Sequence, residues 1–362
     1  MNKENFYCVI LAGGIGMRLW PTSRQNRPKQ FIDFFGRGDT LLQMTYKRFA
    51  RFLDNANILV LTNNQYADLV REQLPDLPRE NLLLEPMRRN TVPSVTWASV
   101  EIHHRNPNAS IIVSPADQLI SDDDLFPTDM LNALDYVSRK QRLLTLGVFP
   151  SRAETAYGYI QMAEKMEDTV YHVQSFTEKP EQEFAKIFLE SREFLWNTGL
   201  FVFQVNTYLQ AIQQTPDGFA NIIESAEQRS EDGKDYHELL EESFSKCLNL
   251  SLEQGILERS ENVDVMLCHF GWADLGTWGS LHTAMPKSAD KNVVMPSAQT
   301  MLYDCSDCLV KLPDHRVAVI QGLEGYMVVE QDGVLVICPK DDQKAIRKFV
   351  NDVQLSLGDQ YV

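Results

Sequence analysis

Short apolar runs alternate with amphipathic stretches along the first half of the chain. Four runs rich in Ile, Val and Leu predict buried strands, at residues 6–12, 57–62, 82–84 and 110–114. Apolar residues recur at helical spacing in three intervening stretches, 40–53, 64–73 and 94–104. Thr40 is a candidate N-cap for the first of these helices. Strands separated by helices predict a largely parallel sheet with helices on both faces.

The middle of the chain continues this alternation and then becomes helical. Four further runs predict strands, at residues 143–148, 157–162, 170–176 and 199–205. A long charged stretch over about 206–260 predicts helices, and residues 263–270 predict one more strand. We therefore expect an α/β fold of the Rossmann-like kind, with a mixed, mostly parallel sheet.

The pattern changes after Leu281. Short β-rich runs punctuated by Gly, Asp and Pro follow, at residues 308–312, 316–321, 326–330 and 333–338. A terminal helix is predicted from Asp341 to about Leu357. We expect two domains, 1–285 and 286–362, the second a small β-rich unit for which a β-helix is one architecture.

Composition excludes several classes of protein. The 362 residues are 44% apolar and 23% charged, which is ordinary globular usage. The net charge of −16 repels nucleic-acid backbones and anionic lipid, so we expect neither partner. No apolar run approaches the roughly 18 residues that span a bilayer. The apolar run after the polar N-terminus is also too short for a signal peptide.

Six scattered cysteines form no disulfide framework, and we expect a reducing, cytoplasmic location. Cys8 and Cys338 lie in apolar strand-like runs, which predicts buried free thiols. Cys305 and Cys308 form a C-x-x-C pair without two further metal ligands near by, so the pattern does not assign them a role.

A glycine-rich turn follows the first strand and carries the strongest chemical signal. Gly13, Gly14 and Gly16 allow close backbone approach to an anion, and Arg18 and Lys29 add two positive charges. A polyphosphate is therefore the expected ligand. A dinucleotide fingerprint would need Gly where Leu19 stands, and the Gly-Lys-Ser/Thr of a P-loop is absent.

Two aspartates are candidate magnesium ligands. Asp117 follows a buried strand, and Asp274 follows the strand predicted at 263–270, which places both at the edge where open α/β sheets bind ligands. Mg²⁺ prefers oxygen ligands and bridges phosphates. Capping of a helix or turn is the alternative role for each aspartate.

Glu178 and Lys179 precede Pro180 at a predicted strand end. Lys179 could hold the phosphate of a second substrate, and Glu178 could accept hydrogen bonds from sugar hydroxyls. A solvated loop with a chance ion pair is the alternative.

These segments resemble a known family. Gly-Gly-x-Gly-x-Arg-Leu-x-Pro followed by Arg-Pro-Lys resembles the signature of the sugar-1-phosphate nucleotidyltransferases, and its form here resembles the mannose-1-phosphate guanylyltransferase branch. The resemblance covers essentially the whole chain. Its further matches are Glu85-Pro86 with Arg89-Asn90-Thr91, then Ser114–Asp117, Phe176–Pro180, Trp196–Gly199 and Asp274–Trp278.

The resemblance implies a reaction and a set of site residues. GTP and mannose 1-phosphate would give GDP-mannose and pyrophosphate, by in-line attack of the sugar phosphate on the α-phosphorus, with Mg²⁺ as cofactor. The implied residues, by role, are catalytic Arg18, Lys29 and Lys179; nucleotide-binding Leu11, Ala12, Gly13, Gly14, Gly16, Glu85, Asn90 and Thr91; sugar-binding Gly158, Glu178 and Asn197; and magnesium-binding Asp117 and Asp274. Glu85 is the candidate for guanine because that base presents donors at N1 and N2.

Similar family tails contribute to dimers, so the resemblance also implies a homodimer. Many relatives carry an added isomerase domain, and we expect a short form without it. The family commonly has His where this chain has Gln118, Ser where it has Thr198, and Glu-Lys where it has Glu258-Arg259. These departures keep polar or charged character, so they bear on rate or substrate preference more than on reaction class.

Three alternatives stay open. The first is the same chemistry with glucose 1-phosphate and dTTP, UTP or ATP. The second is a non-catalytic regulatory subunit on this fold, which tends to lose the glycine-loop arginine, the lysine or the metal aspartates. The third, a nicotinamide dehydrogenase, is disfavoured by Leu19.

Overall fold

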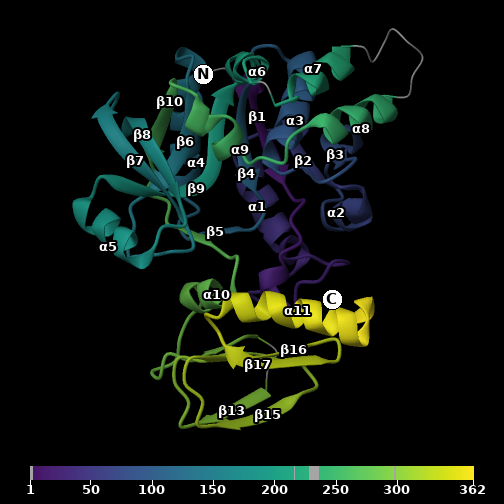
Figure 1. Cartoon of the computed structure of the whole chain (residues 1–362), viewed down its shortest axis with the longest axis vertical. Coiled ribbons are helices and arrows are strands. Elements are labelled where there is room, and N and C mark those ends of the chain that lie inside the picture. Colours follow the sequence, from purple (N-terminus) through teal and green to yellow (C-terminus); the bar gives the residue numbers. More distant parts are fainter. Residues whose placement is uncertain (1–2, 216, 228–235, 297–298) are drawn as a thin grey trace.

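A nine-stranded mixed sheet forms the centre of the molecule (Figure 1). The computed structural model describes residues 3–215, 217–227, 236–296 and 299–362. In spatial order the strands are β3 (Leu82–Glu85), β2 (Ile58–Asn63), β1 (Phe6–Leu11), β4 (Ser110–Pro115), β9 (Phe194–Gln204), β6 (Leu143–Val148), β10 (Val263–Leu267), β8 (Val170–Glu178) and β7 (Gly158–Lys165).

The sheet is mixed, as the α/β prediction requires, but its two halves differ. Strands β3, β2, β1 and β4 pair in parallel, and so do β6 and β10. Strand β9 runs antiparallel to β4, β6 and β7, while β8 runs antiparallel to β7 and β10. Parallel pairing therefore dominates only the half that carries the glycine-rich turn.

Helices cover both faces of the sheet, as predicted. The helices before the C-terminal region are α1 (Leu41–Ala50), α2 (Ala67–Gln73), α3 (Thr91–Arg105), α4 (Leu125–Arg139), α5 (Gln182–Ser191), α6 (Val205–Gln213), α7 (Ala220–Glu227), α8 (Tyr236–Lys246) and α9 (Leu252–Gly255). Alternate side chains of β1 enter different cores, because neighbouring residues of a strand point to opposite faces. Ile10 packs in the core that contains Phe49 and Phe126, whereas Val9 packs in the core that contains Val95.

The C-terminal region is β-rich, as predicted, and ends in a helix (Figure 1). Strands β12 (Val293–Val294), β14 (Leu309–Lys311) and β16 (Tyr326–Gln331) pair in parallel, with β17 (Val334–Pro339) antiparallel at the edge. Strands β13 (Gln299–Tyr303) and β15 (Val317–Gln321) form a second parallel pair. The helices α10 (Trp278–Ala284) and α11 (Gln343–Leu357) lie between these small sheets and the large one (Figure 1).

A third core joins the glycine-rich segment to the C-terminal region. Leu19 and Trp20 pack with Trp278, Leu309 and Ile346 in this core. The Trp20 indole N–H also donates to the backbone oxygen of Tyr361 at 2.8 Å. Because this core crosses residue 286, the division into domains 1–285 and 286–362 stays a prediction.

Several helices and strands begin or end at other residues than predicted. The helix predicted at 94–104 begins at Thr91, because Asn90 accepts a capping hydrogen bond from the Thr91 N–H. The strand predicted at 199–205 begins at Phe194, and the strand predicted at 263–270 ends at Leu267. The stretch 206–260 divides into α6, α7, α8 and α9, although residues 216 and 228–235 lie outside the described part.

All six cysteines are free and buried, which confirms the expectation for Cys8 and Cys338. Within the described ranges, none of the helices has the length and apolar character needed to cross a bilayer.

Candidate active site

Side chains hold the glycine-rich turn through its backbone oxygens. Gln30 is buried, and its amide donates to the backbone oxygens of Ala12 at 2.8 Å and Gly14 at 2.9 Å. The Thr62 hydroxyl, at the end of β2, also donates to the Ala12 oxygen at 2.8 Å. In the described structure no protein group pairs with the amide N–H groups of residues 13–16. The turn is thus fixed through its carbonyls while its N–H groups remain available to an anion.

Gly16 has a conformation and a setting that only glycine fits. Its φ is +69°, in the left-handed region. A Cβ atom here would lie 2.7 Å from the Ser23 hydroxyl and 2.8 Å from the Lys29 side chain. The glycine therefore allows the turn to pack directly against Lys29.

Lys29 and the two predicted metal ligands form one charged cluster. The Lys29 ammonium lies 2.6 Å from the Asp117 carboxylate, and the lysine is only 7% exposed. Burial acts to lower the pKa of Lys29, but Asp117 and Asp274 overcome it and raise the pKa above its usual value. Lys29 therefore stays charged inside the site.

Asp274 reaches this cluster through a short ladder that the sequence did not predict. It is the last residue of β11 (Trp272–Asp274), which pairs antiparallel with β5 (Gln118–Ile120), and Asp274 lies opposite Gln118. The ladder brings Asp274 beside the residue that follows Asp117. Asp274 does follow the strand predicted at 263–270, but the sequence did not predict its pairing with β5.

Arg18 lies beside Asp274. A Cβ atom on Gly276 would lie 2.6 Å from the Asp274 carboxylate and 2.8 Å from the Arg18 guanidinium. Burial and the charge of Asp117 raise the pKa of Asp274, while Lys29, Arg18 and Lys179 oppose that rise. One half-buried carboxylate thus interacts with all three predicted catalytic cations.

Glu85 lies at the other side of the glycine turn, at the end of β3. A Cβ atom on Gly13 would lie 3.3 Å from the Glu85 carboxylate. Burial raises the pKa of Glu85 to about 7, although a hydrogen bond from Ser94 and the charge of Arg88 oppose the rise. A carboxyl group beside the turn can therefore change its charge near neutral pH.

The other two predicted nucleotide residues near Glu85 have structural partners. Asn90 caps α3 through its side chain, and its backbone oxygen accepts from Ser94, the same residue that contacts Glu85. The Thr91 hydroxyl accepts from the backbone N–H of Leu252 at 2.8 Å. Asn90 is exposed, next to the pair formed by Ser94 and Glu85, whereas the Thr91 hydroxyl contacts α9.

The three predicted sugar-binding residues lie together. A Cβ atom on Gly158 would lie 2.7 Å from the Glu178 carboxylate and 3.4 Å from Cβ of Asn197. The Asn197 amide donates to Glu253 at 3.0 Å. The β7–β8 ladder explains part of this grouping, because it pairs Gly158 with Glu178 directly.

Lys179 is held much more loosely than Lys29. It has a positive φ of 48° and pairs with the neighbouring carboxylate of Glu178. Its side chain is 55% exposed, against 9% for the side chain of Lys29. The site therefore has a buried cationic side and a solvent-facing one.

The residues present fit a magnesium ion of the kind that binds with phosphates. Mg²⁺ usually takes one or two carboxylates and completes its shell with phosphate oxygens and water. Asp117 and Asp274 supply two carboxylates in one cluster. Among the described residues, no group of three or more His, Cys, Asp or Glu side chains could hold a metal by itself. The set suits an ion that arrives with a nucleotide better than a resident structural metal.

Sequence reasoning missed the residues that hold the site together. Gln30 stands inside the recognised motif, but its contact with the turn depends on a chain path that no pattern reveals. No sequence pattern indicated a role for Ser94 or Glu253. The departures Gln118 and Thr198 turn out to contact one another, since the Gln118 amide donates to the Thr198 backbone oxygen.

Comparisons with known proteins identify the family. Residues 7–291 match the family model described as nucleotidyl transferase. Mannose-1-phosphate guanylyltransferase 2 of Escherichia coli O157:H7 is 31% identical over 100% of this chain and 76% of its own length. The alginate biosynthesis protein AlgA of Pseudomonas aeruginosa is 33% identical over 95% of this chain and 71% of its own. A crystal structure described as mannose-1-phosphate geranyltransferase from Thermus thermophilus superposes with a TM-score of 0.86 and 28% identity, covering 97% of this chain and 99% of that one.

Proposed function

This chain belongs to the mannose-1-phosphate guanylyltransferase family of nucleotidyl transferases, and we propose that it makes GDP-mannose and pyrophosphate from GTP and mannose 1-phosphate. It is a sugar-1-phosphate nucleotidyltransferase. The observation that carries the finer proposal is the joint cluster of Arg18, Lys29, Asp117 and Asp274 beside a glycine turn with available N–H groups.

The nucleotide occupies the buried side of the site. Its phosphates lie along the N–H groups of the turn between Gly13 and Gly16, which carry fixed positive dipoles. Arg18 and Lys29 face the two phosphates that leave as pyrophosphate. Both cations are already positioned, so little reorganisation accompanies the build-up of charge.

The sugar phosphate needs no strong general base because it is already an anion. One of its oxygens forms a bond to the α-phosphorus of GTP, and the bond between the α-phosphorus and the bridging oxygen to the β-phosphorus breaks in line. The electron pair leaves with pyrophosphate. Lys179 holds the attacking phosphate, while Gly158, Glu178 and Asn197 orient the sugar ring and its hydroxyls. Catalysis is positioning and charge neutralisation.

Asp117 and Asp274 would hold the magnesium ion. When bound, Mg²⁺ supplies positive charge to the reacting phosphates and a template for their oxygens. The two carboxylates repel one another, which contributes to the raised pKa of Asp274. Calorimetric titration with Mg²⁺ and GTP should show binding that Asp274→Asn weakens, and unchanged binding in that variant would remove Asp274 from the site.

Glu85 selects guanine. Ionised, it accepts hydrogen bonds from the N1 and N2 donors of the base, and a base without matching donors would leave a buried carboxylate unpaired. Its place beside Gly13 supports this assignment, because the base then continues from phosphates bound along the turn.

A substrate panel tests the proposal. Pyrophosphate release is measured for GTP, ATP, UTP and dTTP, each with mannose 1-phosphate and with glucose 1-phosphate. We expect GTP with mannose 1-phosphate to give the highest kcat/KM. A higher value for another pair would overturn the substrate assignment, and no turnover with any pair despite tight GTP binding would favour a non-catalytic subunit.

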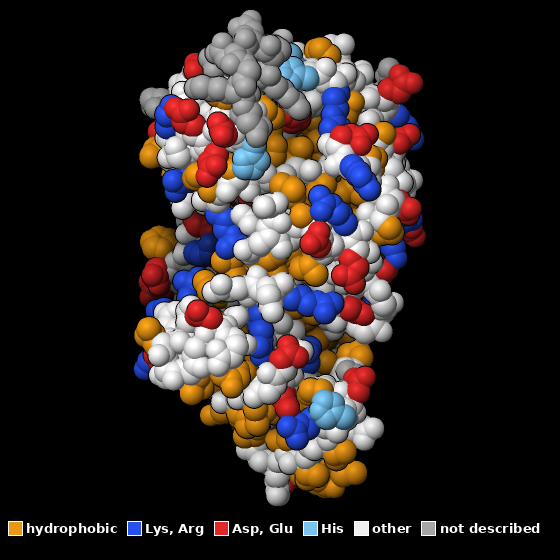
Figure 2. All heavy atoms as spheres, turned by 90° about the vertical axis from the view of Figure 1, so that its right-hand side faces the viewer, with side chains coloured by type: hydrophobic (Ala, Val, Ile, Leu, Met, Phe, Trp, Pro, Cys, Tyr) orange, Lys and Arg blue, Asp and Glu red, His pale blue; other side chains and the backbone are white. Residues whose placement is uncertain are grey.

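We also propose a homodimer formed through the C-terminal sheets. Large apolar side chains are exposed there, and they lie on β13, β15 and β17: Met301, Tyr303, Val317, Val319, Leu335 and Ile337. Met301 and Val319 are paired in register on neighbouring strands. Figure 2 shows apolar side chains gathered at the lower end of the molecule.

The dimer is best tested by a point change. Deleting residues 286–362 would uncover Leu19 and Trp20, which pack against that region, so a truncated chain would not report on assembly alone. Light scattering of Val319→Glu should give half the mass of the unchanged protein, with Lys348→Glu as the exposed control. Equal masses for the unchanged protein and Val319→Glu would contradict the proposed interface.

The acidic net charge and the free buried thiols support a cytoplasmic enzyme without nucleic-acid or membrane partners.

A further inference from the structure

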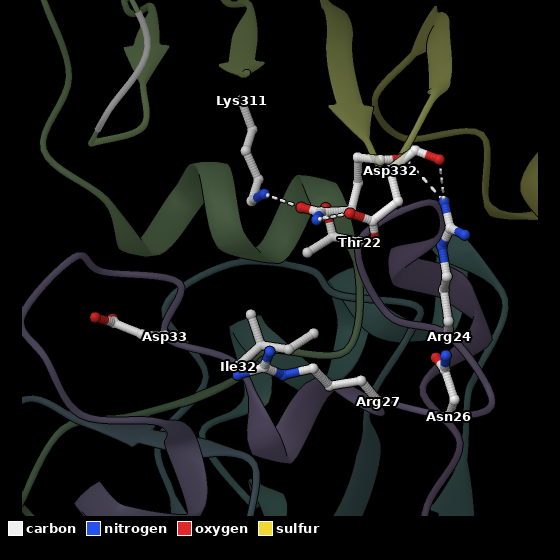
Figure 3. Close-up of a pocket in the computed structure, with 9 residues that line it drawn as sticks. Thr22, Arg24, Asn26, Arg27, Ile32, Asp33, Lys311 and Asp332 are labelled. Carbon is white, nitrogen blue, oxygen red and sulfur yellow. Dashed lines mark hydrogen bonds between the residues drawn. The ribbon is translucent and has the colours of Figure 1, made fainter. Parts of the chain in front are cut away.

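A second polar hollow lies outside the active site, between the signature segment and the C-terminal sheets. It encloses about 370 Å³, a volume within the usual range for small-molecule pockets. Residues of both regions line it, chiefly Thr22, Arg24 and Arg27 from the signature segment and Lys311 and Asp332 from the β-rich region (Figure 3).

Thr22 lines this hollow and carries a buried polar group without a partner among the described residues. The residue is only 6% exposed, and within the described structure its hydroxyl has no hydrogen-bond partner. A buried hydroxyl without a partner costs free energy, so such groups call for an explanation. A bound ligand supplies one.

Three cations surround the same hollow without carboxylate partners. In the described ranges, Arg24, Arg27 and Lys311 form no ion pair, although the chain as a whole carries a net charge of −16. Lys311 donates to the side-chain oxygen of Gln331 at 3.0 Å, which leaves two of its three ammonium donors for another group. Burial lowers the pKa of Lys311, although the charges of Asp332 and Asp314 oppose this effect.

The two arginines have different tasks in this hollow. Arg24 donates to four backbone oxygens, those of Pro21, Gln331, Asp332 and Gln360, and so ties the signature segment to the β16–β17 turn and to the C-terminal residues. Arg27 uses only its Nε, toward the Phe31 oxygen at 3.4 Å, and is exposed at the mouth. Figure 3 shows Lys311 reaching in from the β-rich side and Arg27 from the opposite wall.

The carboxylates on the wall, Asp33 and Asp332, already accept hydrogen bonds from protein groups. Asp33 accepts from the backbone N–H groups of Phe35 at 3.0 Å and Gly38 at 2.8 Å. Asp332 accepts from the Gln331 amide at 2.9 Å. The wall therefore offers unused donors of three kinds: a hydroxyl, an ammonium and a guanidinium.

We propose that this hollow binds the phosphate group of a small molecule, at a site separate from the active site, with Thr22, Arg27 and Lys311 as its donors. A tetrahedral phosphate offers several acceptor oxygens to donors from different directions, and both Arg and Lys pair well with it. The bound molecule bridges the signature segment and the β-rich region, so its binding stabilises the folded chain.

Thermal unfolding with inorganic phosphate as the probe tests the site. Phosphate should raise the Tm of the unchanged protein more than acetate does at equal ionic strength. Lys311→Gln should lose most of this rise, whereas Lys348→Gln, an exposed lysine on α11, should keep it. Arg18→Gln weakens the active site, but this variant should also keep the part of the rise in Tm that depends on Lys311.

Thr22→Val is the second variant, because it replaces an unpartnered hydroxyl with a methyl group of similar size. Its Tm without phosphate should not fall, and its response to phosphate should be smaller. Equal responses in Lys311→Gln and Lys348→Gln, a response that acetate reproduces, or a response abolished by Arg18→Gln would each overturn the proposal. Lys311→Gln should retain turnover with GTP and mannose 1-phosphate, which separates failure of this site from failure of the proposed function.

Discussion

The two sides of the active site are built in different ways. On the nucleotide side, Lys29 is buried and ion-paired with Asp117, and Gln30 fixes the backbone of the turn. On the sugar side, Lys179 is exposed, and its ion-pair partner is the adjacent Glu178. An ion pair with a buried partner, such as Lys29 with Asp117, is costly to disturb, whereas an exposed pair contributes little stability. The proposed nucleotide side is therefore held in place by the protein alone, whereas Lys179 on the proposed sugar side is held more loosely.

Removing one nucleotide-side charge is expected to have the largest effect. Arg18→Ala or Asp117→Ala should lower kcat by about 10²–10⁴-fold, because each change removes fixed charge facing the reacting phosphates and Asp117→Ala also leaves Lys29 without its partner. Pyrophosphate release measures the loss, and circular dichroism checks the fold. Arg71→Ala, an exposed arginine on α2, is the control. Turnover near that of the unchanged protein in both site variants would contradict these roles.

Gly16→Ala tests whether the turn is rigid. The left-handed φ costs about 1 kcal/mol for a non-glycine residue, and the contacts with Ser23 and Lys29 add about 1–3 kcal/mol of overpacking. Denaturant unfolding should therefore show a loss of about 2–4 kcal/mol together with reduced GTP affinity.

Gly38→Ala is the matched control for Gly16→Ala. It has a φ of +85°, but a Cβ atom there would meet nothing within 4 Å. It should show only the loss of about 1 kcal/mol from the backbone and no change in GTP affinity. Equal effects of the two substitutions would mean that the turn does not pack tightly on Lys29.

Glu85 gives the nucleotide side a pH dependence. Because burial raises its pKa to about 7 from the usual value of 4.5, the folded protein holds this proton over a pH range in which the unfolded chain has lost it. Its contribution to the free energy of unfolding is therefore present at low pH and lost as pH rises through about 7, by up to about 3 kcal/mol. Glu85→Gln removes the titration, so the difference in stability between the two proteins should change over this range.

GTP affinity should change in the opposite direction. If the ionised carboxylate accepts from guanine, binding should strengthen as pH rises through about 7 in the unchanged protein and stay flat in Glu85→Gln. Calorimetry at several pH values measures this, and equal pH profiles in the two proteins would rule out Glu85 as the guanine contact.

The exposed sugar side should give the smallest effect. Lys179→Ala should raise KM for mannose 1-phosphate by about 10-fold with little change in KM for GTP, because a solvent-screened lysine contributes modestly to binding. Lys186→Ala, an exposed lysine on α5, is the control. A rise in KM for GTP of the same size would show that the two sides are not separate.

Local patterns predicted much of this fold and of the buried side of the site. The strands β1 to β4 and the charges of Arg18 and Lys29 are all encoded within short stretches, so periodicity and motif revealed them. The position of Asp274 is not encoded within a short stretch. It depends on β11, a three-residue strand whose only pairing in the described structure is with β5, more than 150 positions away in the chain. Contacts between distant segments, such as Asn197 with Glu253, leave no local pattern either.

The pair formed by Gln118 and Thr198 makes the same point. Each departs from the residue that the family commonly has, and each looked like an independent substitution along the chain. In the structure, the Gln118 amide donates to the Thr198 backbone oxygen, and the Thr198 hydroxyl donates to the backbone oxygen of Leu146 at 2.7 Å. The two positions are therefore one contact that joins the Asp117 turn to β9, which only the fold reveals.

The most direct test is a crystal structure of the protein with GTP and Mg²⁺ bound. The account predicts the triphosphate along residues 13–16, Arg18 and Lys29 on its outer phosphates, the ion between Asp117 and Asp274, and the guanine edge against Glu85. A nucleotide bound elsewhere, or an ion that contacts neither aspartate, would contradict it.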